Sequence, residues 1–232
     1  VSIIGGGSYP RPGEISLAHR GVLFLDEIAE FQKKTLDMLR QPLEAGSVTI
    51  SRAQTTVKYP SSFILIAAMN PCPCGFLGSN THYCLCTPKQ IQSYKTRISG
   101  PIYDRMDILL SLKSVNLDQP VAENKSSIEF LSTVEKARER QYTRYGESIT
   151  NAKVPFDVLT KSSPLKEQQM NMIRQMSSKQ QWSNRVQIKI IRLARTISDL
   201  EGSQEITDAS IWKAITLRRE QTYKSNLKAG KR

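Results

Sequence analysis

The sequence predicts an α/β fold followed by an all-helical region, and three features predict it. Residues 22–25 and 63–68 are uninterrupted apolar runs, the pattern of strands that are covered on both faces in a parallel sheet. Between them, residues 48–59 contain two β-prone runs joined by a short turn, which predicts a hairpin. Beyond about residue 156 the chain reads as helix only. We therefore expect part of an α/β core, with a parallel sheet, flanking helices and a hairpin insertion, and then an all-α domain.

Length and composition are those of an ordinary globular protein. The chain has 232 residues, enough for one large domain or two modest ones. No apolar run approaches the roughly 20 residues of a membrane helix and no signal-peptide pattern opens the chain, so we expect a cytoplasmic protein without a membrane partner. Lysines and arginines outnumber acids by 33 to 21, for a net charge of +12. This surplus favours a polyanionic partner such as DNA, although many solvated surfaces are simply basic.

The first segment of the chain is rich in glycine and proline. Residues 1–13 include three consecutive glycines, which predicts a loop rather than a regular element. No Gly-Lys-Ser/Thr follows it in this chain, so the sequence motif that cradles nucleotide phosphates is missing here. The chain begins at Val1 rather than Met, which suggests a piece of a longer protein. A short helix over 14–19 leads to the strand at 22–25.

Two acids, Asp26 and Glu27, follow that strand. Ligands of open α/β sheets bind at the carboxyl ends of the strands, so these carboxylates are placed to hold Mg²⁺ and to orient a water. The pattern resembles a Walker B element, in which the Asp secures Mg²⁺ and the next acid polarises the water that attacks a phosphoryl group. The alternative is an ordinary strand end with two solvated acids.

The next elements are a helix and the hairpin. Apolar residues recur at helical spacing over 31–44, and Gly46 ends the helix. Arg52 lies at the tip of the hairpin, where it is either an exposed charge or a contact to DNA. The second buried strand, at 63–68, then runs into Asn70, which is placed to reach a nucleotide γ-phosphate or the attacking water. An Asn before proline is otherwise a common turn residue.

All four cysteines follow directly. Cys72 and Cys74 form one pair and Cys84 and Cys86 the other, each with a single residue between them. Because a cytosolic chain keeps its thiols reduced, four clustered cysteines favour a tetrahedral structural Zn²⁺ site. The spacing within each pair is tighter than is usual for zinc, so free or redox-active thiols and a disulfide remain alternatives. His82 could replace one thiolate, or be an ordinary solvated histidine.

An arginine between acids comes after the cysteines. A helix over 88–94 is followed by Arg105, which lies between Asp104 and Asp107, and then by an apolar run over 108–112 that predicts a strand. Such an arginine is normally a surface ion pair of little energetic value. The alternative is an arginine finger, which reaches the ATP of a neighbouring subunit and neutralises charge in the transition state.

The rest of the chain predicts helices. A polar, turn-rich stretch over 116–127 precedes them, and Ser183 and Thr207 are predicted N-caps. Arg185, in a first helical turn, opposes the helix dipole, which is tolerated more readily if it faces a phosphate. The predicted helices are 128–145, 156–161, 165–178, 184–201 and 207–220. We divide the chain into 1–115 (the α/β core part), 116–150 (linker and connecting helix) and 151–232 (the helical domain).

Several of these stretches together resemble the magnesium-chelatase-like AAA+ ATPase family, of the competence-protein (ComM) type. The resembling stretches cover nearly the whole chain and include residues 5–8, 10–19, 21–27, 48–53, 67–75, 97–107 and 194–200. The resemblance implies part of an AAA+ P-loop core followed by a helical lid. It also implies roles for single residues: Asp26 and Glu27 as Walker B, Asn70 as sensor 1, Arg105 as the arginine finger, Arg185 as sensor 2 and Arg52 on a pore hairpin that contacts DNA.

The resemblance further implies cofactors and partners. ATP and Mg²⁺ would be the cofactors, and the longer protein would be a homohexameric motor that acts on single- or double-stranded DNA and promotes branch migration in natural transformation. The alternative within this family is a magnesium-chelatase-type subunit or chaperone-like remodeller that acts on a protein partner. Because the Walker A portion is absent from this sequence, we predict that the chain alone does not hydrolyse ATP.

Overall fold

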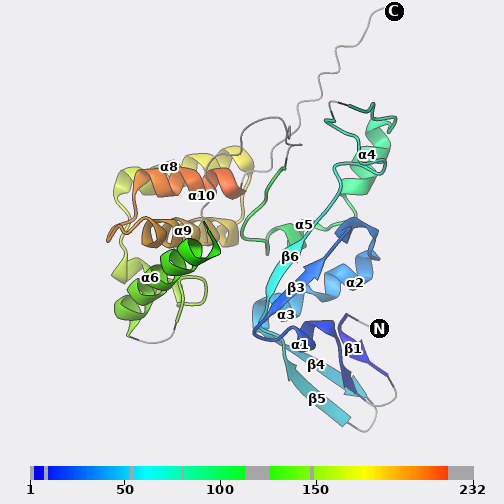
Figure 1. Cartoon of the computed structure of the whole chain (residues 1–232), viewed down its shortest axis with the longest axis horizontal. Helices are drawn as coiled ribbons and strands as arrows, with labels where there is room; N and C mark the ends of the chain where they lie inside the picture. The colour runs from blue at the N-terminus through cyan, green and yellow to red at the C-terminus, as the bar shows by residue number, and fades with distance from the viewer. Residues whose placement is uncertain are drawn as a thin grey trace, which may run out of the picture. The chain divides into compact units, whose positions relative to one another are not determined.

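The chain folds into two compact units, Val1–Met106 and Asp107–Arg232 (Figure 1). The first unit is mixed α/β and the described part of the second is helical, which confirms the predicted fold class. The computed structural model describes residues 3–7, 10–52, 55–79, 81–112, 126–146 and 149–218.

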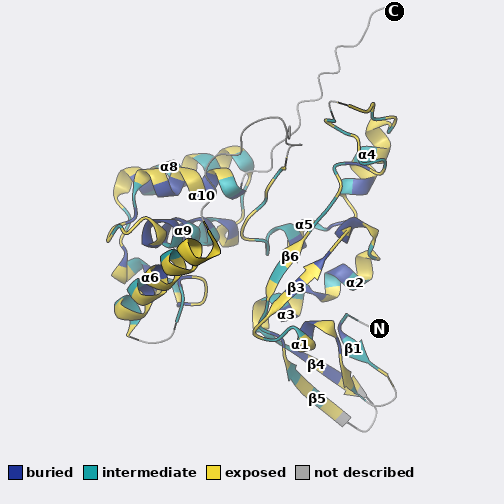
Figure 2. Cartoon of the chain, in the orientation of Figure 1, coloured by how far each residue is buried: buried dark blue, intermediate teal, exposed yellow. Residues whose placement is uncertain are grey.

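A two-stranded parallel sheet lies at the centre of the first unit. Strand β3 (Val22–Leu25) pairs with β6 (Ile64–Ala67), so that Leu25 lies opposite Ala67. Leu23 and Leu25 point into the core of this unit. The opposite face is exposed in the part of the chain that the structure describes (Figure 2), so the prediction that both faces are covered is wrong for this chain. The side chains exposed on it are Val22, Phe24, Ile64 and Ile66.

The glycine-rich first segment contains a short antiparallel pair, β1 (Gly5–Gly6) with β2 (Arg11–Pro12), so the prediction of a loop without regular elements is wrong. The pairing depends on Gly5, whose φ is +101°. A Cβ there would lie 2.3 Å from the Arg11 carbonyl oxygen and 2.9 Å from Cδ1 of Ile50. Glycine is therefore required for the close approach of this segment to its neighbours. Helix α1 (Glu14–Leu17) follows as predicted.

The helix predicted over 31–44 is broken into shorter pieces. They are a 3₁₀ turn η1 (Ile28–Glu30), α2 (Lys33–Met38) and α3 (Arg40–Ala45). Pro42 explains the break, since it has no N–H to donate to the Met38 carbonyl four residues earlier. The predicted hairpin is confirmed as β4 (Ser47–Arg52) and β5 (Thr55–Pro60), paired antiparallel.

The predicted strand at 108–112 does not form. Among the described residues no strand pairs with it, and the N–H of Leu109 donates to the carbonyl oxygen of Leu217 at 2.7 Å. The apolar run has the composition of a strand, but a strand also needs a neighbouring strand to complete its backbone hydrogen bonds. Helices α4 (Pro88–Lys95), which was predicted, and α5 (Gly100–Tyr103), which was not, precede it.

The second unit is built around α9 (Asn184–Leu200). Its buried residues, among them Ile190 and Ala194, form a core with α10 (Asp208–Arg218) and the other helices. The N-cap predictions are confirmed: the Ser183 hydroxyl accepts from Val186 N, and the Thr207 hydroxyl accepts from Ser210 N at 3.1 Å. Within the described ranges, no helix combines the length and the apolar composition of a membrane span. The remaining helices are α6 (Ser127–Tyr145), α7 (Phe156–Ser162) and α8 (Glu167–Gln180).

Candidate active site and candidate metal centre

Two hydrogen bonds continue the ladder beyond the ends of β3 and β6. Ala68 N donates to the Leu25 carbonyl oxygen at 2.9 Å, and Ile28 N donates to the Ala68 carbonyl oxygen at 3.0 Å. The two strands therefore end together. The residues that follow each strand lie at the same carboxyl edge of the sheet, which is where open α/β sheets bind ligands.

Asp26, Glu27 and Asn70 occupy this edge, and all three are exposed. Glu27 N donates to Oδ1 of Asp26 at 2.9 Å, and Glu27 has φ 47° and ψ 45°, a left-handed conformation that is uncommon outside glycine. Carboxylate oxygens are the ligands that Mg²⁺ prefers. The edge therefore fits a nucleotide-bound Mg²⁺, with Asp26 as the residue that would hold it and Glu27 free to turn toward a water.

Helix α4 lies beside this acidic edge. Arg97, just after α4, donates to the Ala29 carbonyl oxygen at 3.1 Å and pairs with Glu30 at 2.8 Å. The pKa of Tyr94 is raised, first by burial and then by the negative charge of Glu30 and Glu27. No local sequence pattern predicts these contacts, because they join residues that are more than sixty positions apart.

The predicted arginine finger, Arg105, is engaged within its own unit. Its side chain is 10% exposed and pairs with Glu44 at 2.9 Å. Its Nε donates to the Arg40 carbonyl oxygen at 3.1 Å, and its Nη1 donates to the Pro101 carbonyl oxygen at 2.8 Å. These contacts join α5 and the residues just after it to α3. Helix α3 is followed by Gly46 and then by the hairpin.

The structure places two further predicted site residues as follows. The backbone of Arg52 closes the hairpin opposite Thr55, while its side chain is outside what the structure describes. Arg185 lies exposed in the first turn of α9, in the second unit. Neither position tests the predicted role.

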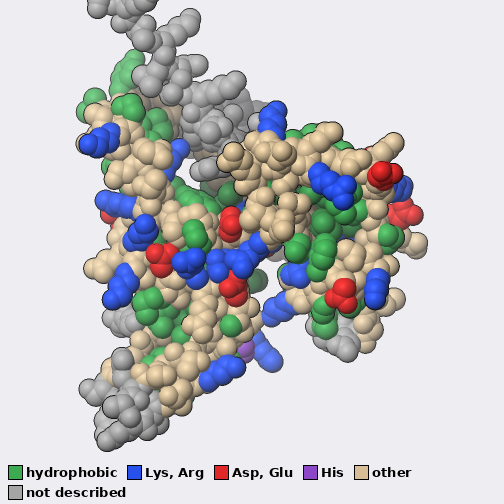
Figure 3. Space-filling view, turned by 180° about the vertical axis from the view of Figure 1, so that it is seen from behind, with side chains coloured by type: hydrophobic (Ala, Val, Ile, Leu, Met, Phe, Trp, Pro, Cys, Tyr) green, Lys and Arg blue, Asp and Glu red, His purple; other side chains and the backbone are tan. Residues whose placement is uncertain are grey.

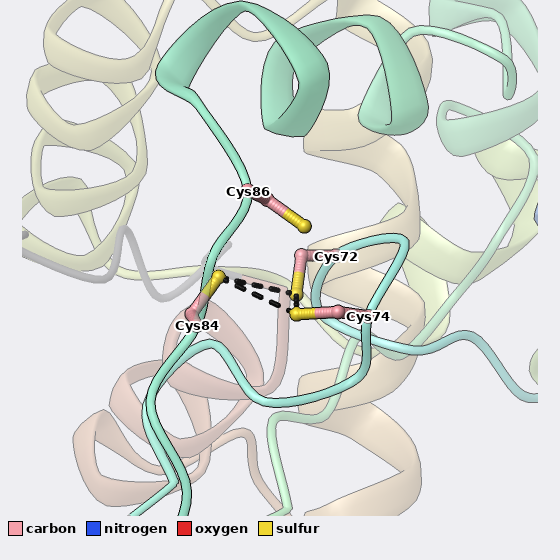
Figure 4. A group of neighbouring side chains, drawn as sticks. All are labelled: Cys72, Cys74, Cys84 and Cys86. Carbon is pink, nitrogen blue, oxygen red and sulfur yellow. Dashed lines mark hydrogen bonds between the residues drawn. The ribbon is translucent and has the colours of Figure 1, made fainter.

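The four cysteines form a compact cluster (Figure 4). Their Sγ atoms all lie within 4.8 Å of one another, and three of the separations are 3.4 to 3.6 Å. In a tetrahedral site with Zn–S bonds of ~2.3 Å, the sulfur atoms are ~3.8 Å apart. The arrangement of Cys72, Cys74, Cys84 and Cys86 therefore fits one zinc ion.

The thiols differ in acidity. The backbone N–H of Phe76 is the main cause that lowers the pKa of Cys74 to about 6, and the other three thiols lower it further against the effect of burial. The backbone N–H of Cys86 acts in the same direction on Cys84, but burial and the neighbouring thiols raise its pKa to about 12.

His82 is not part of this cluster. Its ring stacks on Phe76, with centroids 4.7 Å apart, and its Nδ1 hydrogen-bonds with the Thr81 hydroxyl at 2.9 Å. The alternative in which His82 replaces a thiolate is therefore not the one that the structure adopts.

A buried charge network in the second unit was missed by the sequence analysis. Asp199 and Arg195 are fully buried and pair at 3.0 Å along α9, and Arg144 from α6 reaches the same carboxylate. Asn151 is a third donor residue, whose Nδ2 donates to the same carboxylate at 2.8 Å. The spacing of Arg195 and Asp199, four residues apart on the apolar face of a helix, was the signal that could have found the pair.

Comparison with known proteins gives two family matches. The profile described as "Magnesium chelatase, subunit ChlI" matches residues 1–119, and the one described as "Magnesium chelatase, subunit ChlI C-terminal" matches residues 124–218. The first alone covers more than half of the chain.

Individual relatives agree with the profiles. Competence protein ComM of Haemophilus influenzae is 38% identical over 221 residues, which cover 94% of this chain and 42% of that protein. Protein YifB of Salmonella typhimurium is 37% identical, over 94% of this chain and 43% of that protein. The magnesium-chelatase subunit ChlI homolog of Methanocaldococcus jannaschii is 21% identical, over 89% of this chain and 51% of that protein. The chain thus spans less than half the length of its ComM and YifB relatives, and it belongs to the magnesium-chelatase-like AAA+ ATPase family, ComM type.

Proposed function

We propose that this chain is the C-terminal part of a ComM-like AAA+ ATPase, a homohexamer that couples ATP hydrolysis to DNA translocation and branch migration in natural transformation or recombination. The observation that carries the proposal is the parallel pairing of β3 with β6, whose carboxyl ends lead into Asp26 and Glu27 on one strand and toward Asn70 on the other. Membership of the family implies ATP and Mg²⁺ as cofactors. The similarity to a competence protein over 94% of the chain supports the DNA-directed role.

The remaining site residues have defined roles in this proposal. Asp26 holds Mg²⁺, Glu27 orients the attacking water, and Asn70 hydrogen-bonds the γ-phosphate or that water. Arg185 contacts the nucleotide from the helical unit. Arg105 serves the neighbouring subunit, and to do so it must give up its contacts with Glu44 and with two backbone carbonyls. The chain alone is inactive, because it carries no Gly-Lys-Ser/Thr motif.

The response of ATP hydrolysis to partners tests the proposed function. In the longer protein, single-stranded DNA should raise the ATPase rate. Arg52→Ala should weaken DNA binding. It should also reduce the slope of log affinity against log salt concentration by ~0.7, which corresponds to the loss of one phosphate contact. Lys58→Ala, on the other strand of the hairpin, is the matched control for a general loss of charge. Stimulation by a protein subunit and not by DNA would instead favour the second candidate, a chelatase-type subunit, to which the Methanocaldococcus relative points.

A structural zinc ion in the cysteine cluster is part of the proposal. The purified chain, prepared without chelator, should contain about one equivalent of zinc, since the four Sγ atoms fit a closed tetrahedral site. Cys74→Ser should lower the zinc content to less than about half an equivalent, because a neutral hydroxyl replaces a thiolate ligand. Elemental analysis measures both. Lys89→Gln, an exposed substitution shortly after the cluster, should keep its zinc; a wild-type chain without zinc contradicts this part of the proposal.

A further inference from the structure

The cysteine cluster forces two apolar side chains outward. Residues 83–86 lie outside the helices and strands, in the segment that leads to α4. Cys84 and Cys86 both point into the cluster, as Figure 4 shows. The residues between and before them, Leu85 and Tyr83, are 89% and 94% exposed. Such exposure of a large aromatic residue beside a tightly held cluster is a feature that folding alone does not explain.

The segment around Tyr83 is held in shape from both sides. Before it, His82 stacks on Phe76 with an angle of 18° between the rings. After it, Thr87 caps α4 in a reciprocal capping box with Gln90. Tyr83 is therefore presented on a braced loop, and little conformational entropy has to be lost when a ligand covers its ring.

The cysteine loop and helix α4 carry no acid of their own, and the acid that reaches this region, Glu30, is paired with Arg97. From Ala45 to Tyr103 the sequence contains no Asp or Glu. Figure 3 shows basic and hydrophobic side chains, with acidic ones among them, on one face of the molecule. A zinc ion with four thiolates would carry a formal charge of −2, and the cysteines that would hold it are Cys72, Cys74, Cys84 and Cys86. The cations that follow the loop in this stretch are Lys89, Lys95 and Arg97, and Arg97 pairs with Glu30.

We propose that the cysteine loop, Cys72–Cys86, is a contact for single-stranded DNA in which an unpaired base stacks on Tyr83 and Leu85 and a phosphate meets Lys89. This deepens the proposed function and rests on it. An exposed aromatic ring with nearby cations is the combination that binds single strands, because every base offers a π-face. In a duplex these faces are already stacked, so Tyr83 selects the single strand. A loop and a helix that carry no acid also oppose the docking of a second copy of this chain, whose net charge is +12.

The loop is a contact separate from the hairpin. Within the first unit, Figure 1 places α4 and the β4–β5 hairpin at opposite ends. Substitutions at the two places should therefore act independently, and their effects on the free energy of binding should add.

The test is a binding titration of the 232-residue chain with a fluorescent oligo-dT of about 20 nucleotides at several salt concentrations. Tyr83→Ala should weaken binding at least ~5-fold at every salt concentration and leave the salt slope unchanged, because stacking releases no counterions. Tyr83→Trp should bind at least as tightly as the wild type. Lys89→Gln should instead reduce the salt slope by ~0.7, the loss of one phosphate contact on a single strand.

Phe130→Ala is the matched control, since Phe130 is an exposed aromatic residue on α6 in the other unit. It should bind as the wild type does. Circular dichroism and zinc content of the Tyr83 variants should also match the wild type, because a side chain that is 94% exposed contributes little to the core.

Three results would overturn the proposal. Equal DNA affinity of Tyr83→Ala and the wild type would contradict the loop contact. It would not contradict the proposed ATPase function, which is tested separately by DNA stimulation of the longer protein. A wild-type chain that does not bind the oligonucleotide would also contradict the loop contact. If Tyr83→Ala changes the oligomeric state measured by sedimentation and not the affinity for DNA, the surface is an interface between copies of the chain.

Discussion

Replacing Glu27 by Gln in the longer ComM-like protein should lower the rate of ATP hydrolysis by about 10²- to 10⁴-fold while ATP still binds. A side chain that takes or orients a proton in the transition state contributes a factor of this size. Glutamine keeps the length and the hydrogen-bonding capacity of the side chain but cannot accept the proton. Asp26, the residue that would hold Mg²⁺, is unchanged. Steady-state hydrolysis and ATP binding, measured on the same preparation, separate the two effects.

Glutamine is preferred to alanine here because of the backbone. Glu27 is left-handed, with φ 47°, and it precedes the 3₁₀ turn η1 whose first residue bonds to Ala68. A change that disturbed this turn would move Asp26 as well, and a loss of activity would then have two causes. With Gln, the backbone and the residue size stay the same, so the carboxylate is the only feature that changes.

Glu30→Gln is the control for that experiment. Glu30 lies three residues further on, is about half exposed, and pairs with Arg97 at 2.8 Å. An exposed ion pair contributes ~0–1 kcal/mol, so hydrolysis by Glu30→Gln should stay within a few-fold of the wild type. A Glu27→Gln protein that retains hydrolysis within tenfold of the wild type would contradict the assignment of Glu27 as the residue that orients the water.

The sequence predicts features that depend on neighbours along the chain. The hairpin, the N-caps at Ser183 and Thr207, and the helices of the second unit all follow from local periodicity and capping, and all are present. The shared carboxyl edge of β3 and β6, from which Asp26 and Asn70 follow, was also predictable, because parallel strands end on the same side of a sheet. The break between α2 and α3 could have been predicted from Pro42, whose missing N–H is a purely local property.

Other features depend on partners that the sequence does not identify. The run at 108–112 has the composition of a strand but has no described strand beside it. Arg105 reads in sequence as an arginine between two acids, whereas in the structure its carboxylate partner is Glu44, about sixty residues earlier. The same holds for Arg97 with Glu30. Long-range pairs of this kind depend on tertiary packing, and local patterns do not encode it.

Replacing Asp199 by Asn should lower the free energy of unfolding of the helical unit by about 3–5 kcal/mol. Removing one partner of a buried ion pair leaves an uncompensated buried charge, and the cost is of this size. In this case two guanidinium groups, of Arg144 and Arg195, share the lost carboxylate. An Asn side chain would also turn an NH₂ group toward donors from Arg144 or Asn151, where an oxygen accepts now.

Tryptophan fluorescence during urea unfolding measures this effect in the right unit. The chain has two tryptophans, Trp182 and Trp212, and both belong to the helical unit. Their signal therefore follows that unit even if the α/β unit unfolds in a separate transition. Glu135→Gln, an exposed acid on α6, is the control and should change stability by less than ~0.5 kcal/mol.

The position of Asp199 explains why the loss should be large. Arg195 is fully buried, and besides the carboxylate it donates to the carbonyl oxygens of Ser203 at 2.6 Å and Gln204 at 2.8 Å, in the turn that leads to α10. Arg144 brings in α6. The carboxylate thus joins α6, α9 and the α9–α10 turn, and its loss should loosen all three together. A destabilisation below about 1 kcal/mol would mean that water or a neighbouring group compensates the two arginines, and that apolar packing along α9 alone holds the helical unit together.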